Sequence, residues 1–481
     1  MKASKRNPEL KVEQTKEKLR GERAKNRKLR QRIKELEGSR DELWSKVKRL
    51  RQQIKAHKGQ NRRWKGVAHR RESIGCHKYD VGIVSLCLSL YASAGCSYRA
   101  VRQVLLCIQL ELGLVGMGLP SKSSIENWVH KLGYHYYLQS GQDLRDPYAI
   151  IIDESMVVGQ ERMLVALGVM AQKQNSQALS LEDVRVLGFA VRASWKWGDV
   201  KSFVQEVQAK MGTKASYVVC DGGVNLCKGM KESDLTRICD IGHEVCKLTE
   251  QTYLHDERYE PWSKAVIKVR FQVFMKETAY LLPPKQRTVA RFTNLCHVTD
   301  WALNMLKALP QLNDQEKQTY GWMREHQTFV EELASVFAMN QSILQLIKND
   351  GLSMATIEAC IKICNKAPGS VPWTIRNKII AYLQGEKAKL PHQKACWHAS
   401  SDVLESLFGK YKARAASNPL NGVTARVLTL ALMTFGNDTI EQLRTQVKPA
   451  LEGISLANIE QWKSKHLSEN QIVRRKRKFK N

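Results

Sequence analysis

Tyr148-Ala-Ile-Ile-Ile-Asp-Glu-Ser155 is the stretch around which the fold is organised. It is a short apolar run, rich in β-branched isoleucine, that ends in two carboxylates. This pattern is typical of a buried strand that carries a charged residue to the edge of a sheet. A second such run, Ser216-Tyr-Val-Val-Cys-Asp-Gly-Gly223, ends in Asp221, and its glycines permit a tight turn that leaves the carboxylate exposed. Two strands that each end in an aspartate predict a cation site with Asp153 and Asp221 as ligands.

Residues 145–258 alternate between strand and helix patterns in an order that predicts an α/β core. One carboxylate lies on the first strand and another on the fourth, which is the order of a ribonuclease H-like fold. The expected elements are strands at Tyr148–Asp153, Met163–Met170 and Val184–Ser194 with a turn at Gly159, a helix at Asp199–Met211, the strand before Asp221, and a strand at Thr236–Gly242.

Four segments in this setting carry a resemblance to a known family. They are Ile152-Asp-Glu-Ser155, Val219-Cys-Asp-Gly-Gly-Val-Asn225, Asp240-Ile-Gly-His243 and Asp402-Val-Leu-Glu-Ser-Leu-Phe-Gly-Lys-Tyr-Lys412. In their order and setting they resemble the DDE transposases of bacterial insertion sequences, over about residues 75 to 445. The resemblance implies an enzyme that binds the ends of its element, cuts there with metal-activated water and joins the freed 3′-hydroxyl to target DNA.

The expected chemistry explains the residue types. In-line phosphoryl transfer is served by two Mg²⁺ or Mn²⁺ ions about 3.5 to 4 Å apart, and such hard cations prefer carboxylate oxygens. Asp153, Asp221 and Glu405 are the expected metal ligands and catalytic carboxylates. The resemblance places the imidazole of His243 close to the scissile phosphate. The other candidates for the third carboxylate are Glu244, Asp300 and Glu358.

The distance along the chain between Asp221 and Glu405 is 405 − 221 = 184 residues, which requires an insertion in the core. Residues 259–395 show helical periodicity almost throughout, with stops at prolines and glycines. This resembles the all-helical insertion of hAT-like transposases. Residues 396–465 are expected to complete the core with C-terminal helices. The expected helical stretches of the insertion are Trp262–Leu282, Val289–Leu309, Trp322–Ile347, Met354–Cys364 and Trp373–Leu383.

The N-terminal region, residues 8–57, predicts a basic coiled coil, because its apolar positions step alternately by three and four. The alternative is a single solvated helix, since Gly38 interrupts the run. A coiled coil predicts a homodimer or a higher homo-oligomer. The seam positions are Asn26, Leu29, Ile33, Leu36, Arg40, Leu43, Val47, Leu50 and Ile54.

Residues 75–138 predict a helix-turn-helix DNA-binding domain. Its third helix is expected to open behind Pro120 with a Ser123–Glu126 capping box and to stop at Gly133. On that helix Lys122, Ser124 and Asn127, together with His130, are expected to enter a major groove. The alternative is generic three-helix packing without DNA contact.

Further basic residues are candidates for DNA-phosphate contacts. Arg62 and Arg63 lie in a charged segment that reads either as a phosphate-contacting strap or as a solvated linker. Lys410 and Lys412 follow Glu405, and Lys412, seven residues on, lies two turns along the same helix face. Residues 466–481 predict a basic, disordered, phosphate-binding tail.

Charge and composition favour double-stranded DNA as the partner. The chain of 481 residues has a formal net charge of +30 and a pI near 9.7, which indicates a polyanionic partner and only weakly a membrane surface. No apolar run is long enough to span a bilayer, and the N-terminus leads into charge. We therefore expect no membrane association and a cytoplasmic, nucleoid-associated location.

The cysteines and tryptophans have both a structural and a functional interpretation. The 12 cysteines show no framework spacing, so reduced core thiols are favoured over disulfides. A zinc site from Cys239, His243 and Cys246, with Cys396 and His398, is the less favoured alternative. Base stacking by tryptophan is no more favoured than core packing; the candidates are Trp195, Trp197 and Trp397.

Two alternatives to the transposase remain open at this stage. A hydrolytic nuclease with the same core never joins strands. A domesticated, catalytically inactive DNA-binding protein would have the same positive charge and the same helix-turn-helix domain but would not cut or join DNA.

Overall fold

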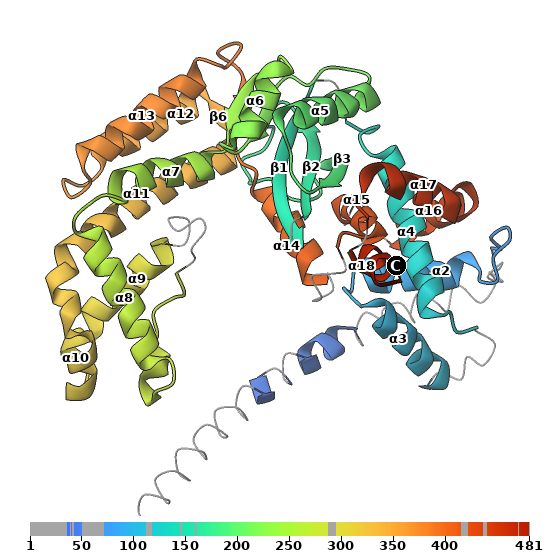
Figure 1. The fold of residues 1–481 in the computed structure, drawn as a ribbon, viewed down its shortest axis with the longest axis horizontal. Helices are drawn as coiled ribbons and strands as arrows, with labels where there is room; N and C mark the ends of the chain where they lie inside the picture. Colours follow the sequence, from blue (N-terminus) through green and yellow to red (C-terminus); the bar gives the residue numbers. More distant parts are fainter. Residues whose placement is uncertain are drawn as a thin grey trace, which may run out of the picture. The chain divides into compact units, whose positions relative to one another are not determined.

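The computed structural model divides the chain into two compact units, Met1–Arg71 and Glu72–Asn481. Figure 1 draws the ribbon. The described parts of the first unit, residues 36–38, 40 and 43–50, are helical, as the coiled-coil prediction requires of a single chain. Four of the predicted seam positions lie outside the described residues, as do Arg62 and Arg63; they are Asn26, Leu29, Ile33 and Ile54. In the second unit the structure describes residues 72–111, 118–144, 147–158, 161–286, 295–414, 422–435, 440–469 and 471–480.

A five-stranded mixed sheet with a ribonuclease H-like pattern forms the centre of the second unit. Its order is β3-β2-β1-β4-β5, in which β2 runs antiparallel to both β3 and β1, while β1, β4 and β5 are parallel to one another. The expected neighbourhood of the first and fourth strands is confirmed. The predicted turn at Gly159 lies outside the described residues. The strands are β1 Tyr148–Val158, β2 Glu161–Met170, β3 Arg185–Arg192, β4 Val218–Cys220 and β5 Arg237–Cys239.

The two faces of the sheet pack against different helices, because successive side chains of a strand point to opposite faces. Ile150 and Ile152 lie in the smaller apolar cluster, which is covered by α5 (Trp197–Met211) and α6 (Val224–Glu232). Ile151, between them, belongs to the larger cluster on the other face. Asp153 follows Ile151 by two residues and is therefore expected on that second face.

The predicted strand Thr236–Gly242 is too long. β5 ends at Cys239, and helix α7, Ile241–Tyr253, begins two residues later. The reason is Asp240, whose side chain caps α7 by accepting a hydrogen bond from the backbone N–H of His243 at 2.7 Å. His243 therefore lies in the first turn of a helix and not beyond a strand end.

The region after α7 is largely helical, as expected, although residues 287–294 lie outside the described part. In this region β6 (Leu352–Ser353) pairs with β7 (Cys396–Trp397) to form a two-stranded ribbon. The sequence did not predict this ribbon, because strands of two residues leave no periodic pattern. The main helices are α8 Tyr259–Val273, α9 Leu295–Ala308, α10 Asp314–Tyr320, α11 Gln327–Asp350, α12 Met354–Lys366 and α13 Trp373–Lys387. Short 3₁₀ turns lie at η1 Glu277–Leu281, η3 Leu309–Gln311 and η4 Gly321–His326.

The three helices of the predicted helix-turn-helix domain are present, but both predicted ends of the third helix are wrong. They are α2 Val81–Ala92, α3 Tyr98–Glu111 and α4 Lys122–Gln139. The N-cap of α4 is Ser121, whose hydroxyl accepts from the N–H of Ser124, so the expected Ser123–Glu126 capping box is wrong. The helix also passes through Gly133, which serves close packing instead of ending it: a Cβ there would lie 2.7 Å from the carbonyl oxygen of Leu428.

The C-terminal helices pack against this reader and against the sheet. α15 and α17 contact both α4 and β3, α16 contacts α2 and α4, and α14 lies on β1 (Figure 1). The segment 75–138 therefore shares its core with the end of the chain. These elements are α14 Asp402–Arg414, η6 Ala425–Leu428, α15 Thr429–Thr434, α16 Ile440–Gly453, α17 Leu456–His466 and α18 Gln471–Lys480.

The basic tail is helical over Gln471–Lys480, whereas a disordered tail was expected. Lysine and arginine have good helix propensity, and this counts against disorder in so short a segment. Among the helices that the structure describes, none is long and apolar enough to cross a membrane.

Candidate active site

Two aspartates come together on neighbouring parallel strands, Asp153 inside β1, which continues to Val158, and Asp221 directly after the end of β4. In the register of β1 with β4, Ile151 pairs with Val219, and Asp153 and Asp221 each follow by two residues. The side chain of Asp221 also accepts a hydrogen bond from the N–H of Gly223 at 2.9 Å, which fixes it in the turn after β4. The sequence correctly predicted that these two strands are neighbours, but the expectation that the first strand ends at Asp153 is wrong, because β1 stays paired with β2 as far as Val158.

The surroundings of Asp153 disfavour the charged form of its carboxyl. Burial, and next the negative charge of Asp221, raise the pKa of Asp153 to about 7. A hydrogen bond from the N–H of Glu154 at 2.7 Å and the nearby His243 act in the opposite direction. Two carboxylates held together in this way attract a cation or a proton.

Glu405 reaches the same face of the sheet from the first turn of α14. Its Oε1 lies 3.4 Å from Nε2 of His243, which comes from α7. This contact raises the pKa of His243 to about 9, against the opposing effect of burial, and it lowers the pKa of Glu405. The charges of Glu405 and His243 both influence the pKa of Asp153, as does that of Asp221, so Asp153 is electrostatically coupled to the other three predicted catalytic side chains.

Asp240 fixes the relative position of α7 and α14. It is buried, and while one carboxylate oxygen caps α7, the other accepts hydrogen bonds from the N–H and the hydroxyl of Ser401 at 2.5 and 2.9 Å. The N–H of Ile241 also donates to the carbonyl of Ala399 at 2.8 Å. These bonds join the start of the helix that carries His243 to the start of the helix that carries Glu405. The predicted signature from Asp240 to His243 thus combines a structural aspartate with a histidine at the site.

The carboxylate oxygens of Asp153, Asp221 and Glu405 are the kind of ligand that hard divalent cations prefer. In the part of the chain that the structure describes, no three His, Cys, Asp or Glu side chains are grouped closely enough to hold a metal ion as they stand. Glu405 is directed to His243, while burial and the negative charge of Asp221 keep the pKa of Asp153 raised. A cation between the aspartates would relieve that repulsion, and Glu405 would join it by leaving the imidazole.

The competing carboxylates are less well placed than Glu405. Glu154, on the opposite face of β1, forms an ion pair with Arg162 at 2.8 Å. Glu244 pairs with Lys247 and Glu358 with Lys387, each at 3.3 Å.

Asp300, the remaining competitor, is one of the residues around a cavity of about 720 Å³ that opens beside His243 and Glu405. The cavity has walls from α7, α9, α11 and α14. Lys348, in the last turn of α11, also lines it and forms an ion pair with Asp402 in the first turn of α14. Sequence reasoning missed Lys348, because a lysine in the last turn of an amphipathic helix looks like an ordinary solvated residue.

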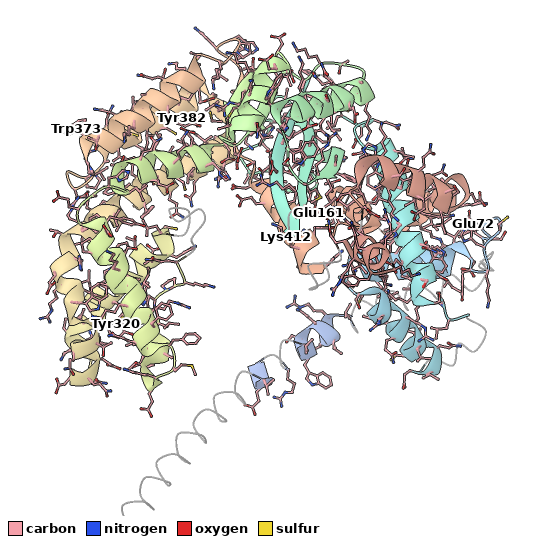
Figure 2. The ribbon with its side chains drawn as sticks, viewed as in Figure 1. Glu72, Glu161, Tyr320, Trp373, Tyr382 and Lys412 are labelled. Atoms are coloured by element: carbon pink, nitrogen blue, oxygen red, sulfur yellow. The ribbon has the colours of Figure 1, made fainter. Side chains whose placement is uncertain are left out.

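The lysines predicted after Glu405 lie along the exposed part of α14. Lys412 is in its last turn, as labelled in Figure 2, and its charge contributes to the lowered pKa of Glu405. Lys410 lines a second cavity of about 400 Å³ together with Arg414. Both lysines are exposed, so they are accessible to a polyanion.

The residues predicted to enter a major groove are only partly accessible. Lys122 is exposed but forms an ion pair with Glu126 at 3.4 Å, and Ser124 and Asn127 are half-buried. Burial lowers the pKa of His130 to about 4. α4 is surrounded by α2, α3, η6, α15, α16 and α17. The more exposed helix of the three is α3, which presents Arg99, Arg102 and Gln103.

Two of the three tryptophan candidates and the buried Cys239 behave as core residues. All twelve cysteines are free, and burial raises the pKa of Cys239 to about 12, which favours the structural thiol over the zinc ligand. Trp195 donates to the carbonyl of Arg162 at 3.0 Å, and Trp397 stacks on Tyr217 with 4.2 Å between ring centroids. Both are buried, whereas Trp197 is 38% exposed beneath the ammonium of Lys228.

Comparison with protein-family models finds none that matches the chain, and comparison with curated proteins finds no match either.

Proposed function

We propose that the chain is a DDE-type transposase, which binds transposon ends, cuts DNA and joins a 3′-hydroxyl to target DNA. The observation that supports this most directly is the placing of Asp153 and Asp221 at the same level of two adjacent parallel strands, with Glu405 and His243 over the same face. The strand order of the sheet and the helical region between Asp221 and Glu405 agree with the same proposal.

Asp153, Asp221 and Glu405 are the proposed ligands of two Mg²⁺ or Mn²⁺ ions. When bound, such ions activate the attacking oxygen and stabilise the leaving oxygen of a phosphodiester. The chain's own contribution begins with charge: burial and the charge of Asp221 raise the pKa of Asp153 to about 7, so this carboxyl would release a proton more readily beside a cation.

The remaining side chains of the site position the DNA and its protons. While Glu405 pairs with His243, the pKa of the imidazole is raised to about 9 and the ring is protonated near neutral pH; His243 is proposed to lie beside the scissile phosphate. Lys412 and Lys410 on α14 are proposed to hold backbone phosphates of the bound strand.

The proposed partner is double-stranded DNA, on the ground of the net charge of +30 and the exposed basic helix α18. Self-association through the N-terminal helix is proposed from its exposed apolar positions, Leu36, Leu43 and Leu50. A cytoplasmic, nucleoid-associated location is part of the same proposal.

A hydrolytic nuclease would use the same carboxylates, so cleavage alone does not separate it from a transposase. The decisive experiment supplies a DNA end with a preprocessed 3′-hydroxyl, a target plasmid and Mg²⁺, and measures joined product. Joined product supports the transposase, whereas cutting without joining indicates the nuclease. Binding with neither reaction indicates an inactive DNA-binding protein, for which the present pairing of Glu405 with His243 is the favouring observation.

A further inference from the structure

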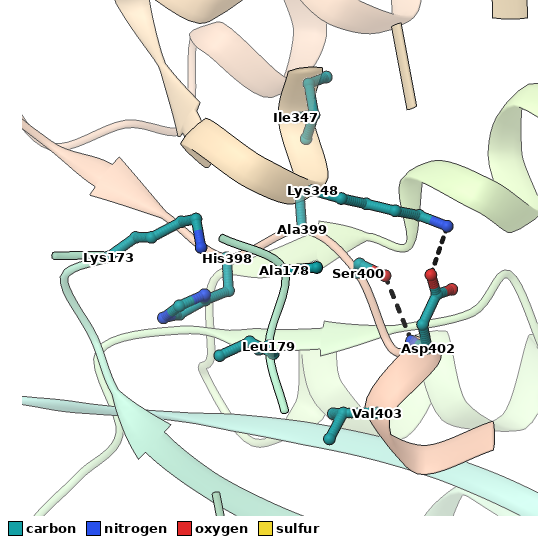
Figure 3. Close-up of a pocket in the computed structure, with 10 residues that line it drawn as sticks. All are labelled: Lys173, Ala178, Leu179, Ile347, Lys348, His398, Ala399, Ser400, Asp402 and Val403. Atoms are coloured by element: carbon teal, nitrogen blue, oxygen red, sulfur yellow. Dashed lines mark hydrogen bonds and ion pairs between the residues drawn. The ribbon is translucent and has the colours of Figure 1, made fainter. Parts of the chain in front are cut away.

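A lysine from the helical region lies at the edge of the candidate active site. Lys348 is in the last turn of α11, and its ammonium forms an ion pair with Asp402 in the first turn of α14, as Figure 3 shows. Its side chain is 25% exposed, so it is neither buried in the core nor free in solvent. It lies 405 − 348 = 57 residues before Glu405 and is brought there only by the fold.

Short-range structure fixes this placement from both sides. Four residues after Lys348, Leu352 pairs with Trp397 in the β6–β7 ribbon, and Asp402 follows Trp397 by five residues. The segment after the ribbon is tied to the sheet region, because the N–H of Lys173 donates to the carbonyl of Cys396 at 2.9 Å. The end of α11 and the start of α14 are therefore held together by backbone hydrogen bonds that do not depend on the ion pair.

The ammonium of Lys348 also acts on the proposed catalytic residues. Its charge contributes to the lowered pKa of Glu405, as does that of Lys412 from the far end of α14. Lys348 lines the cavity of about 720 Å³ together with His243, Asp402 and Glu405. Polar side chains of the same helix, Gln341 and Gln345, face the cavity as well. The cavity is therefore open to solvent and next to the carboxylates, with these polar side chains set in a largely apolar wall.

We propose that this cavity receives the DNA strand next to the scissile phosphate, and that Lys348 binds a phosphate of that strand. The inference rests on the proposed function and adds to it a residue from the helical region. In the free protein Asp402 holds the ammonium in place, and a phosphate competes with that carboxylate when DNA binds. A lysine is suited to this exchange because its ammonium is a compact point charge on a flexible stem.

The alternative is that Lys348 only bridges α11 to α14, and three variants separate the two roles. Lys348→Met keeps the apolar stem and removes the charge, Asp402→Asn releases the lysine, and Lys348→Arg keeps a cation. Lys387→Met is the matched control, since Lys387 forms a similar interhelical ion pair with Glu358 and does not line the cavity. Affinity of the full chain for a fluorescent duplex with one unpaired end is measured in EDTA over a salt series.

Phosphate binding predicts opposite signs for the two halves of the ion pair. Lys348→Met should weaken binding roughly fivefold to tenfold at about 0.1 M salt and reduce the salt slope by about one contact. Asp402→Asn should bind as well as the parent chain or more tightly, while Lys348→Arg and Lys387→Met stay near it. Equal losses for Lys348→Met and Asp402→Asn, or an unchanged slope for Lys348→Met, overturn the inference.

A second measurement uses the unaltered chain and so does not depend on the folding of variants. Lysine acetylation is read out by mass spectrometry with and without the duplex. DNA should protect Lys348 and leave Lys387 reactive; equal reactivity of Lys348 in both states refutes the inference. Either failure leaves the proposed function standing, because that function depends on cleavage by the carboxylates and is tested by their own substitution.

Discussion

The carboxylate of Asp240 accepts two hydrogen bonds from Ser401, at 2.5 and 2.9 Å, although 161 residues separate them. The other oxygen of Asp240 caps α7. One buried side chain therefore sets the distance between the helix of His243 and the helix of Glu405 across the whole helical region. The geometry of the candidate site depends on this joint as much as on the sheet.

Substitution of the three carboxylates tests the chemistry. Asp153→Asn, Asp221→Asn and Glu405→Gln should each abolish Mg²⁺-dependent strand cleavage, because each removes a charged metal ligand, while DNA affinity stays within about twofold. Cleavage of a labelled end duplex and its binding are measured side by side. Glu154→Gln is the matched control, since Glu154 neighbours Asp153 but pairs with Arg162 on the other face. If one of the three variants cuts DNA at the parent rate, the residue that it replaces is not part of the catalytic site.

The raised pKa of Asp153 predicts a pH dependence of stability in the absence of metal. The pKa is about 7 in the folded chain against an ordinary 3.8, so the folded state binds more protons between these values. The free energy of unfolding contributed by this group therefore falls as the pH rises from about 4 to about 7. Asp153→Asn removes the penalty and should stabilise the chain at pH 8 by roughly 2 kcal/mol, and by less at pH 5. Thermal melts of Asp153→Asn and of the parent chain in EDTA measure the difference in stability. A difference that does not vary with pH contradicts the raised pKa of Asp153.

Divalent cations should act in the same pH window. Because a cation competes with the proton on Asp153, the rise in melting temperature on addition of Mg²⁺ should be larger at pH 8 than at pH 6. The rise should be lost in Asp221→Asn and kept in Glu154→Gln. An equal rise in all three proteins would show that Mg²⁺ binds elsewhere.

Breaking the joint at Asp240 should affect both stability and catalysis. Asp240→Ala removes an N-cap and leaves Ser401 without its acceptor in a buried place, at a cost of roughly 2 to 4 kcal/mol. Cleavage should fall further than DNA binding, because Glu405 and His243 lose their relative position. Ser455→Ala, at the N-cap of the remote α17, is the control and should cost about 1 kcal/mol without loss of cleavage. Chemical denaturation and the cleavage rate at a temperature below both melts supply the comparison.

Close packing of α4 predicts the outcome of two glycine substitutions. Gly133→Ala places a Cβ 2.7 Å from the carbonyl oxygen of Leu428 and should destabilise the chain by roughly 1 to 3 kcal/mol. Gly385→Ala, inside α13 with nothing within 4 Å of the added carbon, should stabilise it by roughly 0.5 to 1 kcal/mol. Melting temperatures that shift in the same direction for both variants would argue against a close contact at Gly133.

The exposed leucines of the first unit predict self-association. Leu36 and Leu43 are 58% and 61% exposed in the single chain, and their joint replacement by Glu should abolish a dimer in solution. Lys48→Gln with Arg49→Gln, off the predicted seam, changes the net charge by the same two units and is the control. Mass in solution by light scattering decides; an unchanged mass for the leucine variant dismisses the coiled coil.

Local patterns in the sequence were sufficient for the sheet and its two aspartates. The apolar runs before Asp153 and Asp221 specify buried strands on their own, and their parallel pairing follows from the chain order. Helical periodicity likewise predicted the region between Tyr259 and Lys387, because each helix buries a stripe that repeats every three to four residues. Where a single side chain competed with the pattern, as Asp240 does at the end of β5, the predicted boundary was wrong.

Only the tertiary structure decided how the distant parts of the site meet. The contact of His243 with Glu405, the joint from Asp240 to Ser401 and the approach of Lys348 to Asp402 each connect residues more than fifty positions apart. The burial of α4 by helices from the end of the chain is of the same kind. A sequence determines local periodicity directly, whereas long-range contacts arise from the packing of completed elements, and no short stretch of residues records them.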